Sequence, residues 1–441
     1  MKPILILNGL FKNMKQYFAF SFYKYTLVAV LSIVFSACTK QSNSTTNVVV
    51  KPVTPAPISV YESQVTILNA ENYQTIQGFG CATVFNPPST SAITNDEFDR
   101  LFGSLSGQVG LNFLRIRIAS DDSWRAIELA NAKAAIQRGA KILASPWSPP
   151  ANMKTNNNII GGKLIVDSSK SYAKYLNDFA KYMQTNGAPL YALSVQNEPD
   201  WDATYESCVW TATEMRDFLK NYGGGITETK LLAPELVNNN QTYMNTILSD
   251  SAATAHLSII GTHIYGGGIA ENGLATLKAK PVWMTEHLDT DTTFTSNLNT
   301  AVEIHDCFTK ANFSAYFWWY GKRYYGLIGQ DGVVTKRGYI VSHFARFIKE
   351  GAVRIGNSVN TRSEVLISAY KNGTKLVIVA INSGSSIINQ TISFKNATTT
   401  SMIPYATTSA SNVVQGNAIN ITNNSFIYTI QPNSIVTFVE Q

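Results

Sequence analysis

The segment LSVQNEPDW, Leu193–Trp201, joins an apolar strand-like run to an abrupt polar end at Asn197, Glu198 and Pro199. A strand buried in a core has no use for a carboxylate, because an unpaired buried charge is costly. Glu198 therefore lies either at a solvated strand end or in a cleft whose chemistry needs an acid. The pattern on both sides of this segment decides between the two.

Short β-rich runs alternate with helical patterns from about residue 65 to about residue 350. The eight runs are 76–85, 111–119, 140–147, 190–198, 230–237, 257–265, 281–287 and 313–320. The clearest helical pattern is 169–186, where Tyr172, Leu176, Phe179 and Met183 form one apolar stripe. The other helical patterns are 95–106, 124–138, 211–222, 241–250, 269–279, 297–311 and 339–349.

Eight such units favour an α/β fold of the (β/α)8 TIM-barrel type. A doubly wound sheet is disfavoured because the first run contains GFGC and no GxGxxG phosphate turn. After about residue 350 the hydrophobic period changes to two, in short runs separated by Asn, Gly and Ser. We therefore predict a barrel over 61–350 and an attached antiparallel β-sandwich side domain over 351–441. Residues 61–75 are strand-like and are compatible with either part.

The N-terminus has the composition of an export signal. Residues 1–37 carry four lysines and no acid before the apolar run TLVAVLSIVFSAC, which is too short for a spanning helix. The end of that run resembles a bacterial lipobox with Cys38 as the lipidated residue, and 38–60 reads as a disordered tether rich in Ser, Thr, Asn and Pro. We predict a signal peptide over 1–37 and a lipoprotein anchored to the bacterial outer membrane or cell surface, with no other membrane contact.

Charge and composition exclude several classes of protein. Removing residues 1–37 lowers the formal net charge from +6 to +2 and leaves no Lys/Arg run, so nucleic-acid binding is not expected. The remaining cysteines, Cys81, Cys208 and Cys307, cannot form a disulfide framework. The five histidines include no HExxH pair, so neither a dedicated metal site nor a cofactor is expected. The protein is expected to be a monomer.

The strand ends carry the chemistry. A (β/α)8 barrel places its active site at the C-terminal ends of its strands. Glu198 ends the fourth run and Glu286 ends the seventh, so the two face each other across the barrel mouth. Two carboxylates flanking an aromatic cleft are what glycoside hydrolysis requires, since one protonates the leaving oxygen while the other attacks the anomeric carbon or activates water. Trp318 and Trp319 are adjacent and must point to opposite faces of the eighth strand, so one of them belongs to the core.

Further motifs narrow the family. SVQNEPD and WMTEH occur in order with QGFG, PWSPPANMKTN, HIYGG and AYFWWYGKRYYGLIGQDGVVTKRGYIVSHFARFIKEG. With these motifs the chain resembles glycoside hydrolase family 30 over about residues 65–441. The last segment is most similar to that of the bacterial glucuronoxylan endo-1,4-β-xylanases.

The resemblance implies a role for each residue that matches a family motif. Glu198 would be the acid/base and Glu286 the nucleophile of a retaining double displacement, with carboxyl groups about 5–5.5 Å apart. Asn197 would bind the sugar hydroxyl next to the reacting carbon. Arg115 would keep Glu286 ionised, and Tyr265 would donate a hydrogen bond to it.

The substrate-binding residues follow from the same resemblance. Trp147 and Trp319 would be stacking platforms. Arg323 and Tyr325 hold the positions that bind the carboxylate of a 4-O-methylglucuronate branch in the glucuronoxylanases. This chain departs from them at Asp291, where they have a serine that also contacts the glucuronate.

The substrate implied is the polysaccharide glucuronoxylan. Other family 30 activities remain open: an endo-β-1,6-glucanase, a β-glucosidase or glucosylceramidase-like enzyme, or a xylanase that needs no glucuronate branch. A catalytically inactive carbohydrate-binding protein is the alternative outside the enzymes. It would have lost one carboxylate, and both are present.

Overall fold

The structure is a computed structural model that describes residues 58–85 and 92–441. The predicted signal peptide, Cys38 and the predicted tether up to residue 57 lie outside the described residues. Within the described part, no helix is long and apolar enough to cross a membrane. Cys81, Cys208 and Cys307 are buried free thiols.

Eight parallel strands form the first sheet, in the spatial order β6-β5-β4-β3-β2-β9-β8-β7. They are β2 (Gly78–Ala82), β3 (Phe113–Ile118), β4 (Lys141–Pro146), β5 (Ala192–Ser194), β6 (Lys230–Leu232), β7 (Ile260–His263), β8 (Val282–Glu286) and β9 (Ala315–Tyr320). The two edge strands are joined by backbone hydrogen bonds, from Ala233 N to Ile259 O at 3.2 Å and from Glu235 N to Gly261 O at 3.0 Å. The sheet therefore closes, and the predicted (β/α)8 barrel is confirmed.

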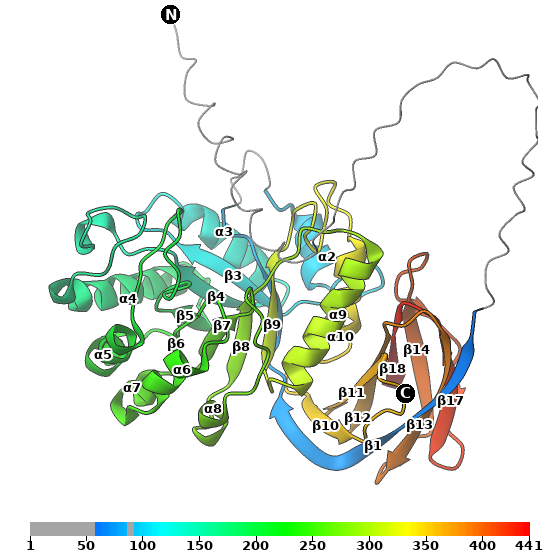
Figure 1. The fold of residues 1–441 in the computed structure, drawn as a ribbon. Helices are drawn as coiled ribbons and strands as arrows, with labels where there is room; N and C mark the ends of the chain where they lie inside the picture. The colour runs from blue at the N-terminus through cyan, green and yellow to red at the C-terminus, as the bar shows by residue number, and fades with distance from the viewer. Residues whose placement is uncertain (1–57, 86–91) are drawn as a thin grey trace, which may run out of the picture. The chain divides into compact units, whose positions relative to one another are not determined.

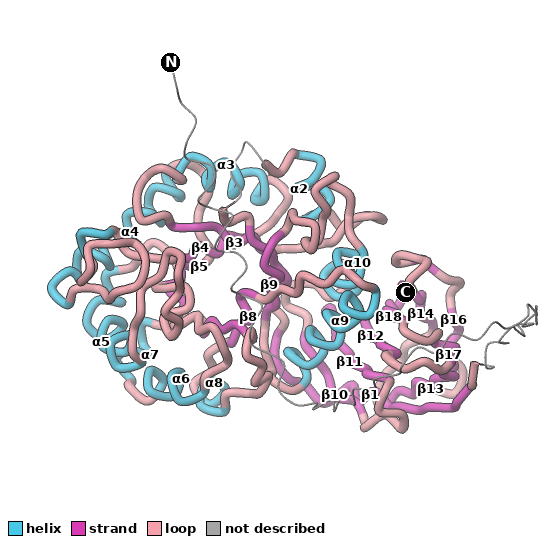
Figure 2. The backbone as a smooth tube through the Cα atoms, turned by 45° about the horizontal axis from the view of Figure 1, so that its top comes forward, coloured by secondary structure: helices cyan, strands magenta, loops and turns pink. Residues whose placement is uncertain are grey.

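Helices surround this barrel (Figures 1 and 2). They are α2 (Asn95–Phe102), α3 (Arg125–Ile136), α4 (Ser169–Thr185), α5 (Ala212–Tyr222), α6 (Gln241–Leu248), α7 (Ser251–His256), α8 (Gly273–Leu277), α9 (Phe294–Thr309) and α10 (Lys336–Ala345). Short 3-10 turns occupy Ala151–Met153, Val166–Ser168 and Gly223–Gly225. The predicted apolar stripe of α4 is buried along its length. Helix α7, which has six residues and is capped at its start by Asp250, was not among the predicted helices.

Aromatic side chains fill the end of the barrel away from the strand C-termini. The inward cluster consists of Phe113, Leu143, Ala192, Leu232, Ile259, Trp283, Ala315 and Phe317. Trp283 packs against Phe113 at 5.0 Å and Phe317 at 5.7 Å between ring centroids. On β2 only glycine fits beside them, since a Cβ on Gly80 would lie 2.3 Å from the Phe317 ring. The inward positions nearer the C-terminal ends of the strands can therefore hold polar groups.

A second sheet of ten strands follows, in the order β15-β14-β18-β12-β11-β10-β1-β13-β17 with β16 beside β14. Its strands are β1 (Val60–Thr75), β10 (Val353–Asn357), β11 (Val365–Asn372), β12 (Lys375–Asn382), β13 (Ile387–Lys395), β14 (Ser401–Thr407), β15 (Val414–Gln415), β16 (Ile419–Asn420), β17 (Ser425–Ile430) and β18 (Ser434–Glu440). The sheet folds over a core of its own, and Phe426 and Tyr428 of β17 contact Phe438 of β18.

Strand β1 belongs to the second sheet, which is one of the two alternatives left open for residues 61–75. It also corrects two expectations. It begins at Val60, inside the predicted tether. It pairs antiparallel with β10 but parallel with β13, so the sheet is mixed and not purely antiparallel. A hairpin forces neighbouring strands to run antiparallel, but β1 reaches this sheet from the far end of the sequence, so no hairpin sets its direction.

The barrel and the second sheet share a continuous core. Tyr370, Val377 and Ile435 of the second sheet belong to the same buried cluster as the outer faces of the barrel strands. Helices α9 and α10 pack against β11, β14 and β18 (Figure 1). At this contact the buried imidazole of His343 lies 2.8 Å from the hydroxyls of both Thr407 and Thr437.

Candidate active site

The two glutamates reach the barrel mouth because the backbone departs from regular strand geometry at each. The predicted strand through Glu198 stops at Ser194, and Glu198 lies beyond it at φ +46°. Glu198 N still donates to Glu235 O at 2.9 Å, which fixes this turn against the neighbouring strand. Expecting a strand up to Glu198 was therefore wrong. Because Glu198 lies in a loop, its carboxylate points in a direction that the alternation of side chains along a strand would not give.

Glu286 is the last residue of β8, and here a register shift decides its direction. Thr262 pairs with Met284, but His263 pairs with Glu286, so one residue of β8 is skipped. Simple alternation would put Glu286 on the outward face with Met284, because Trp283 points into the barrel. The irregularity turns Glu286 inward, where only 6% of its surface is exposed.

Arg115, fully buried on β3, joins the groups of the site. Its guanidinium donates to Glu286 Oε2 at 2.6 Å and to Asn197 Oδ1 at 2.6 Å, and it lies 3.0 Å from Glu235 Oε1. Its Nε donates to Ser145 Oγ at 3.2 Å. A planar guanidinium suits this forked arrangement in a way that an ammonium would not. Arg115 thus lies beside Glu286, as predicted.

Tyr265 donates its hydroxyl hydrogen to Glu286 Oε1 at 2.8 Å. The predicted pairing of Tyr265 with this carboxylate therefore matches the geometry. With Arg115 on Oε2, each oxygen of Glu286 has one donor. Two donors hold the carboxylate in a fixed orientation.

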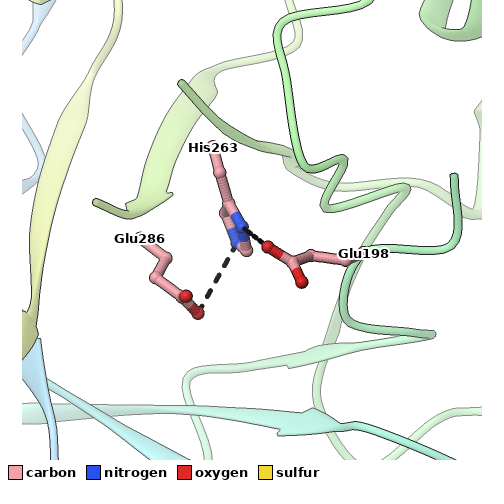
Figure 3. Close-up of side chains that lie close together, drawn as sticks. All are labelled: Glu198, His263 and Glu286. Carbon is pink, nitrogen blue, oxygen red and sulfur yellow. Dashed lines mark hydrogen bonds and ion pairs between the residues drawn. The ribbon is translucent and has the colours of Figure 1, made fainter. Parts of the chain in front are cut away.

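His263, at the end of β7, lies between the two glutamates (Figure 3). Its Nδ1 is 3.1 Å from Glu198 Oε1, and its Nε2 is 4.0 Å from Glu286 Oε2. Glu198 Oε2 accepts a hydrogen bond of 2.8 Å from the hydroxyl of Tyr205. Glu198 also has one partner for each oxygen, but different ones from those of Glu286.

The separation of the carboxylates indicates the type of reaction. One oxygen of Glu198, one oxygen of Glu286 and a nitrogen of His263 all lie within 4.8 Å of one another. Inverting glycosidases keep their carboxyl groups about 6.5–9.5 Å apart to admit a water molecule. The closer approach here is the retaining arrangement, in which one carboxylate attacks the sugar directly.

Burial and neighbouring charges shift the pKa values of the two glutamates in opposite directions. Burial raises the pKa of Glu286, and the positive charges of His263 and Arg115 only partly oppose that rise. Burial also favours the neutral form of Glu198, but the hydrogen bond and charge of His263 outweigh it and lower the Glu198 pKa. Burial lowers the pKa of His263, yet Glu286 and Glu198 raise it overall. Arg115 thus acts on Glu286 in the expected direction, but burial and the charge of Glu198 outweigh it.

Aromatic rings extend from this centre. Trp147 and Trp319 have ring centroids 5.8 Å apart, and the Arg115 guanidinium lies 4.8 Å from the first and 5.6 Å from the second. Trp319 continues to Tyr320 at 4.6 Å. Trp318 is in the core and donates from its indole to Tyr325 O at 3.2 Å. The two adjacent tryptophans therefore face opposite ways, as alternation predicts.

Arg323 is half-buried in the loop after β9, with its guanidinium 4.2 Å from the centre of the Tyr320 ring. Tyr320 in turn lies 6.3 Å from the ring of Tyr325. Among residues 58–85 and 92–441, no carboxylate forms an ion pair with Arg323. Asp291 turns back on its own loop, where it accepts from Thr293 N at 2.8 Å and from Thr293 Oγ1 at 3.1 Å.

Comparisons with known proteins agree with this geometry. A model described as the glycosyl hydrolase family 30 TIM-barrel domain matches residues 91–299. Glucuronoxylanase XynC of Bacillus subtilis (strain 168) is 34% identical over 391 residues, which are 86% of this chain and 92% of the relative. The chain belongs to glycoside hydrolase family 30.

Solved structures of family 30 enzymes superpose on the whole described fold. A subfamily 8 xylanase from Clostridium acetobutylicum gives a TM-score of 0.81 at 37% identity, covering 85% of this chain and 99% of that chain. An endoxylanase from Clostridium papyrosolvens C71 gives 0.79 at 34% identity, covering 86% and 100%. This family 30 protein is therefore a glycoside hydrolase.

The side chains at the active site of this hydrolase that could bind a metal ion do not make a strong cation site. Glu198, His263 and Glu286 lie close enough to share an ion. Yet the guanidinium of Arg115, 2.6 Å from Glu286, already supplies the positive charge that an ion would bring. His287, the other histidine near the mouth, is paired with Glu303 at 2.8 Å. The expectation that the family 30 enzyme has no dedicated metal site stays a prediction.

Sequence reasoning missed three contacts of the hydrolase. It did not pair Glu235 with Arg115. It did not name Glu198 as the partner of His263. It did not single out Tyr205, which lies in the loop after Glu198. Position at or just after a strand end was the available signal for His263 and Glu235, whereas nothing in the local pattern marked Tyr205.

Proposed function

We propose that this family 30 hydrolase is an endo-acting xylanase that cleaves β-1,4-xylosidic bonds of glucuronoxylan with retention of configuration. Glu286 is the nucleophile and Glu198 the acid/base. The assignment is supported by the donors on each side chain, since Arg115 and Tyr265 hold Glu286 as an attacking carboxylate. Glu198 projects from the loop after β5, where its Oε2 accepts a hydrogen bond from the Tyr205 hydroxyl.

The reaction proceeds in two displacements. Glu286 attacks the anomeric carbon and forms a glycosyl ester, while the glycosidic bond breaks and Glu198 gives its proton to the leaving oxygen. Water then attacks the same carbon, Glu198 takes a proton from that water, and the ester bond to Glu286 breaks. The sugar leaves with its original configuration and both carboxyl groups return to their starting state.

Asn197 is oriented for the sugar next to the bond. Its Oδ1 accepts from the Arg115 guanidinium at 2.6 Å, so the amide nitrogen on the same side chain is left as a donor. A donor beside the nucleophile fits the hydroxyl on the neighbouring sugar carbon. Such a bond strengthens as the oxocarbenium-like transition state forms. Trp147 and Trp319 supply stacking surfaces for the pyranose rings.

The observation that carries the choice of substrate is the guanidinium of Arg323. It lies on the aromatic row that begins at Trp319, with no acidic partner in the described part of the chain. A carboxylate on a xylan branch would supply that partner through a bidentate pair, with the Tyr325 hydroxyl beside it. Because the Asp291 carboxylate is held by Thr293, it does not occupy Arg323.

Product analysis tests this proposal. Glucuronoxylan and unbranched xylan are digested in parallel with wild type, Arg323→Ala, Arg323→Lys and a surface control, Arg216→Ala. We expect Arg323→Ala to lose about 10–100-fold in kcat/KM on glucuronoxylan and much less on unbranched xylan, because one charged hydrogen-bonded pair is removed. Arg323→Lys should restore activity only in part. Equal losses on both polymers would show that Arg323 does not read the branch.

We also propose that the chain is exported, lipidated at Cys38 and active as a monomer. The support is the lipobox-like Phe35-Ser36-Ala37-Cys38 after an apolar run that follows four lysines. Incorporation of labelled palmitate into the wild type but not into Cys38→Ser would bear this out. Labelling of both would place the lipid elsewhere. Light scattering of the soluble chain from residue 58 measures the oligomeric state.

A further inference from the structure

Lys322 lies next to Arg323 in the loop after β9, and its side chain is buried. Its ammonium donates to Glu97 Oε1 at 2.7 Å and to Ala92 O at 3.2 Å. Only 10% of the Lys322 side chain and 7% of the Glu97 side chain are exposed. Loss of either partner would leave the other charge buried without a counter-charge, which is strongly unfavourable. The ion pair therefore fixes the Lys322 side chain against α2.

Glu97 is itself held in place, because it is the third residue of α2 and closes the cap of that helix. Its Oε2 accepts from Thr94 N at 2.8 Å, so both of its oxygens are occupied. Another residue of α2, Arg100, donates from its guanidinium to Gly332 O at 2.6 Å, further along the same loop. Helix α2 thus contacts the loop through both Glu97 and Arg100, and Lys322 is bound to a group with a fixed position.

The backbone around Lys322 couples its direction to that of Arg323. Lys322 forms a parallel bridge with Ile328. Ile328 N donates to Gly321 O at 2.8 Å, and Arg323 N donates to Ile328 O at 3.1 Å. Neighbouring side chains of such an extended segment point to opposite sides. Because Lys322 points to α2, Arg323 points away from that helix, and its guanidinium lies 4.2 Å from the centre of the Tyr320 ring.

We propose that the Lys322–Glu97 ion pair determines branch specificity: Lys322 is a positioning residue that orients the Arg323 guanidinium along the aromatic row that begins at Trp319. This inference rests on the proposed function, because it needs Arg323 to bind the branch. The pair also separates the roles of two adjacent cations, since Glu97 neutralises Lys322 and Arg323 is left for the substrate carboxylate. Without the pair, the segment is free to rotate and Arg323 to leave the row.

The test compares the ratio of kcat/KM on glucuronoxylan to kcat/KM on unbranched xylan. Lys322→Met/Glu97→Gln removes both charges, so neither is left buried without a partner, and glutamine still serves as a cap for α2. We expect this double variant to lower the ratio by about 3–10-fold, less than Arg323→Ala, because the guanidinium is displaced and not removed. The matched control is Lys163→Met/Glu214→Gln, since Lys163 Nζ lies 2.8 Å from Glu214, which caps α5 in the same way. The control should keep the wild-type ratio.

The Arg323→Ala background supplies a readout that a general loss of stability would not give. If Lys322 acts through Arg323, adding Lys322→Met/Glu97→Gln to Arg323→Ala should leave the ratio at the Arg323→Ala value. A further fall of the ratio in that background would overturn the inference. A wild-type ratio in Lys322→Met/Glu97→Gln would also overturn it.

Hydrogen exchange of the substrate-free protein separates this inference from the proposed function. Mass spectrometry follows the backbone amides of residues 321–328 and needs no xylan. We expect these amides to exchange about tenfold faster in Lys322→Met/Glu97→Gln than in wild type or in the control variant. Unchanged exchange would overturn the inference and leave the proposed function standing. A wild type with the same kcat/KM on both xylans would instead overturn the proposed substrate, and with it the inference.

Discussion

His343 offers a quantitative test of how the barrel and the second sheet are joined. It lies on α10, and its ring is buried between Thr437 of β18 and Thr407 of β14. The Thr437 hydroxyl donates to His343 O at 2.9 Å, so it has to accept from Nδ1–H. Nε2 is then an acceptor, with the Thr407 hydroxyl as its donor. This chain of hydrogen bonds satisfies the neutral ring and has no place for a second ring proton.

Burial, with a smaller contribution from the charge of Arg346, lowers the pKa of His343 from 6.5 to about 3. The unfolded chain therefore takes up a proton as the pH falls below 6.5, and the folded protein does not. Stability that is present above 6.5 is lost as the pH falls toward 3. Because one pKa unit corresponds to about 1.36 kcal/mol, this group costs about 2.5 kcal/mol of unfolding free energy between pH 7 and pH 4.5.

Urea unfolding followed by tryptophan fluorescence at pH 7 and pH 4.5 measures this loss. His343→Gln should be less stable than wild type at pH 7, by about 1–3 kcal/mol, because buried hydrogen bonds are lost. Its further loss on going to pH 4.5 should be smaller than that of wild type by about 2.5 kcal/mol. His256→Gln, at the exposed end of α7, should keep the wild-type difference. Nitrogen NMR of wild type should show a neutral His343 at pH 4.5. Titration of His343 near pH 6.5 would refute the reasoning. So would equal losses of unfolding free energy between pH 7 and pH 4.5 in wild type and His343→Gln.

Two further predictions concern the reacting groups. Glu286→Ala should lower turnover by about 10⁴-fold or more without changing the circular dichroism spectrum, and near-normal hydrolysis would exclude Glu286 as nucleophile. Tyr265→Phe removes one donor from Glu286, so the pKa of Glu286 should rise by about one unit in a carbon-13 NMR titration of glutamate-labelled enzyme, assigned with Glu286→Gln. An unchanged titration of Glu286 would show that the Tyr265 hydroxyl does not stabilise this carboxylate.

The amino-acid sequence by itself determined the eight alternating strand and helix units of the barrel and the change to a period of two after about residue 350. The period of 3.6 in α4 and the alternation at Trp318 and Trp319 are local properties, and both are present in the structure. The position of Glu198 and Glu286 at the ends of the fourth and seventh barrel strands was also readable, because every parallel strand of a barrel ends on the same side. These features follow from the backbone geometry of neighbouring residues.

Only the tertiary structure decided which side chains meet. Alternation would have turned Glu286 away from the barrel interior, and a register shift against β7 brings it back. Glu198 faces the site because the chain leaves its strand before it, and Tyr205 and His263 reach it from different segments. Register and loop path depend on packing between residues far apart in the sequence. The segment LSVQNEPDW therefore predicts an acid at a strand end. The two hydrogen-bond partners of that acid are decided by the fold.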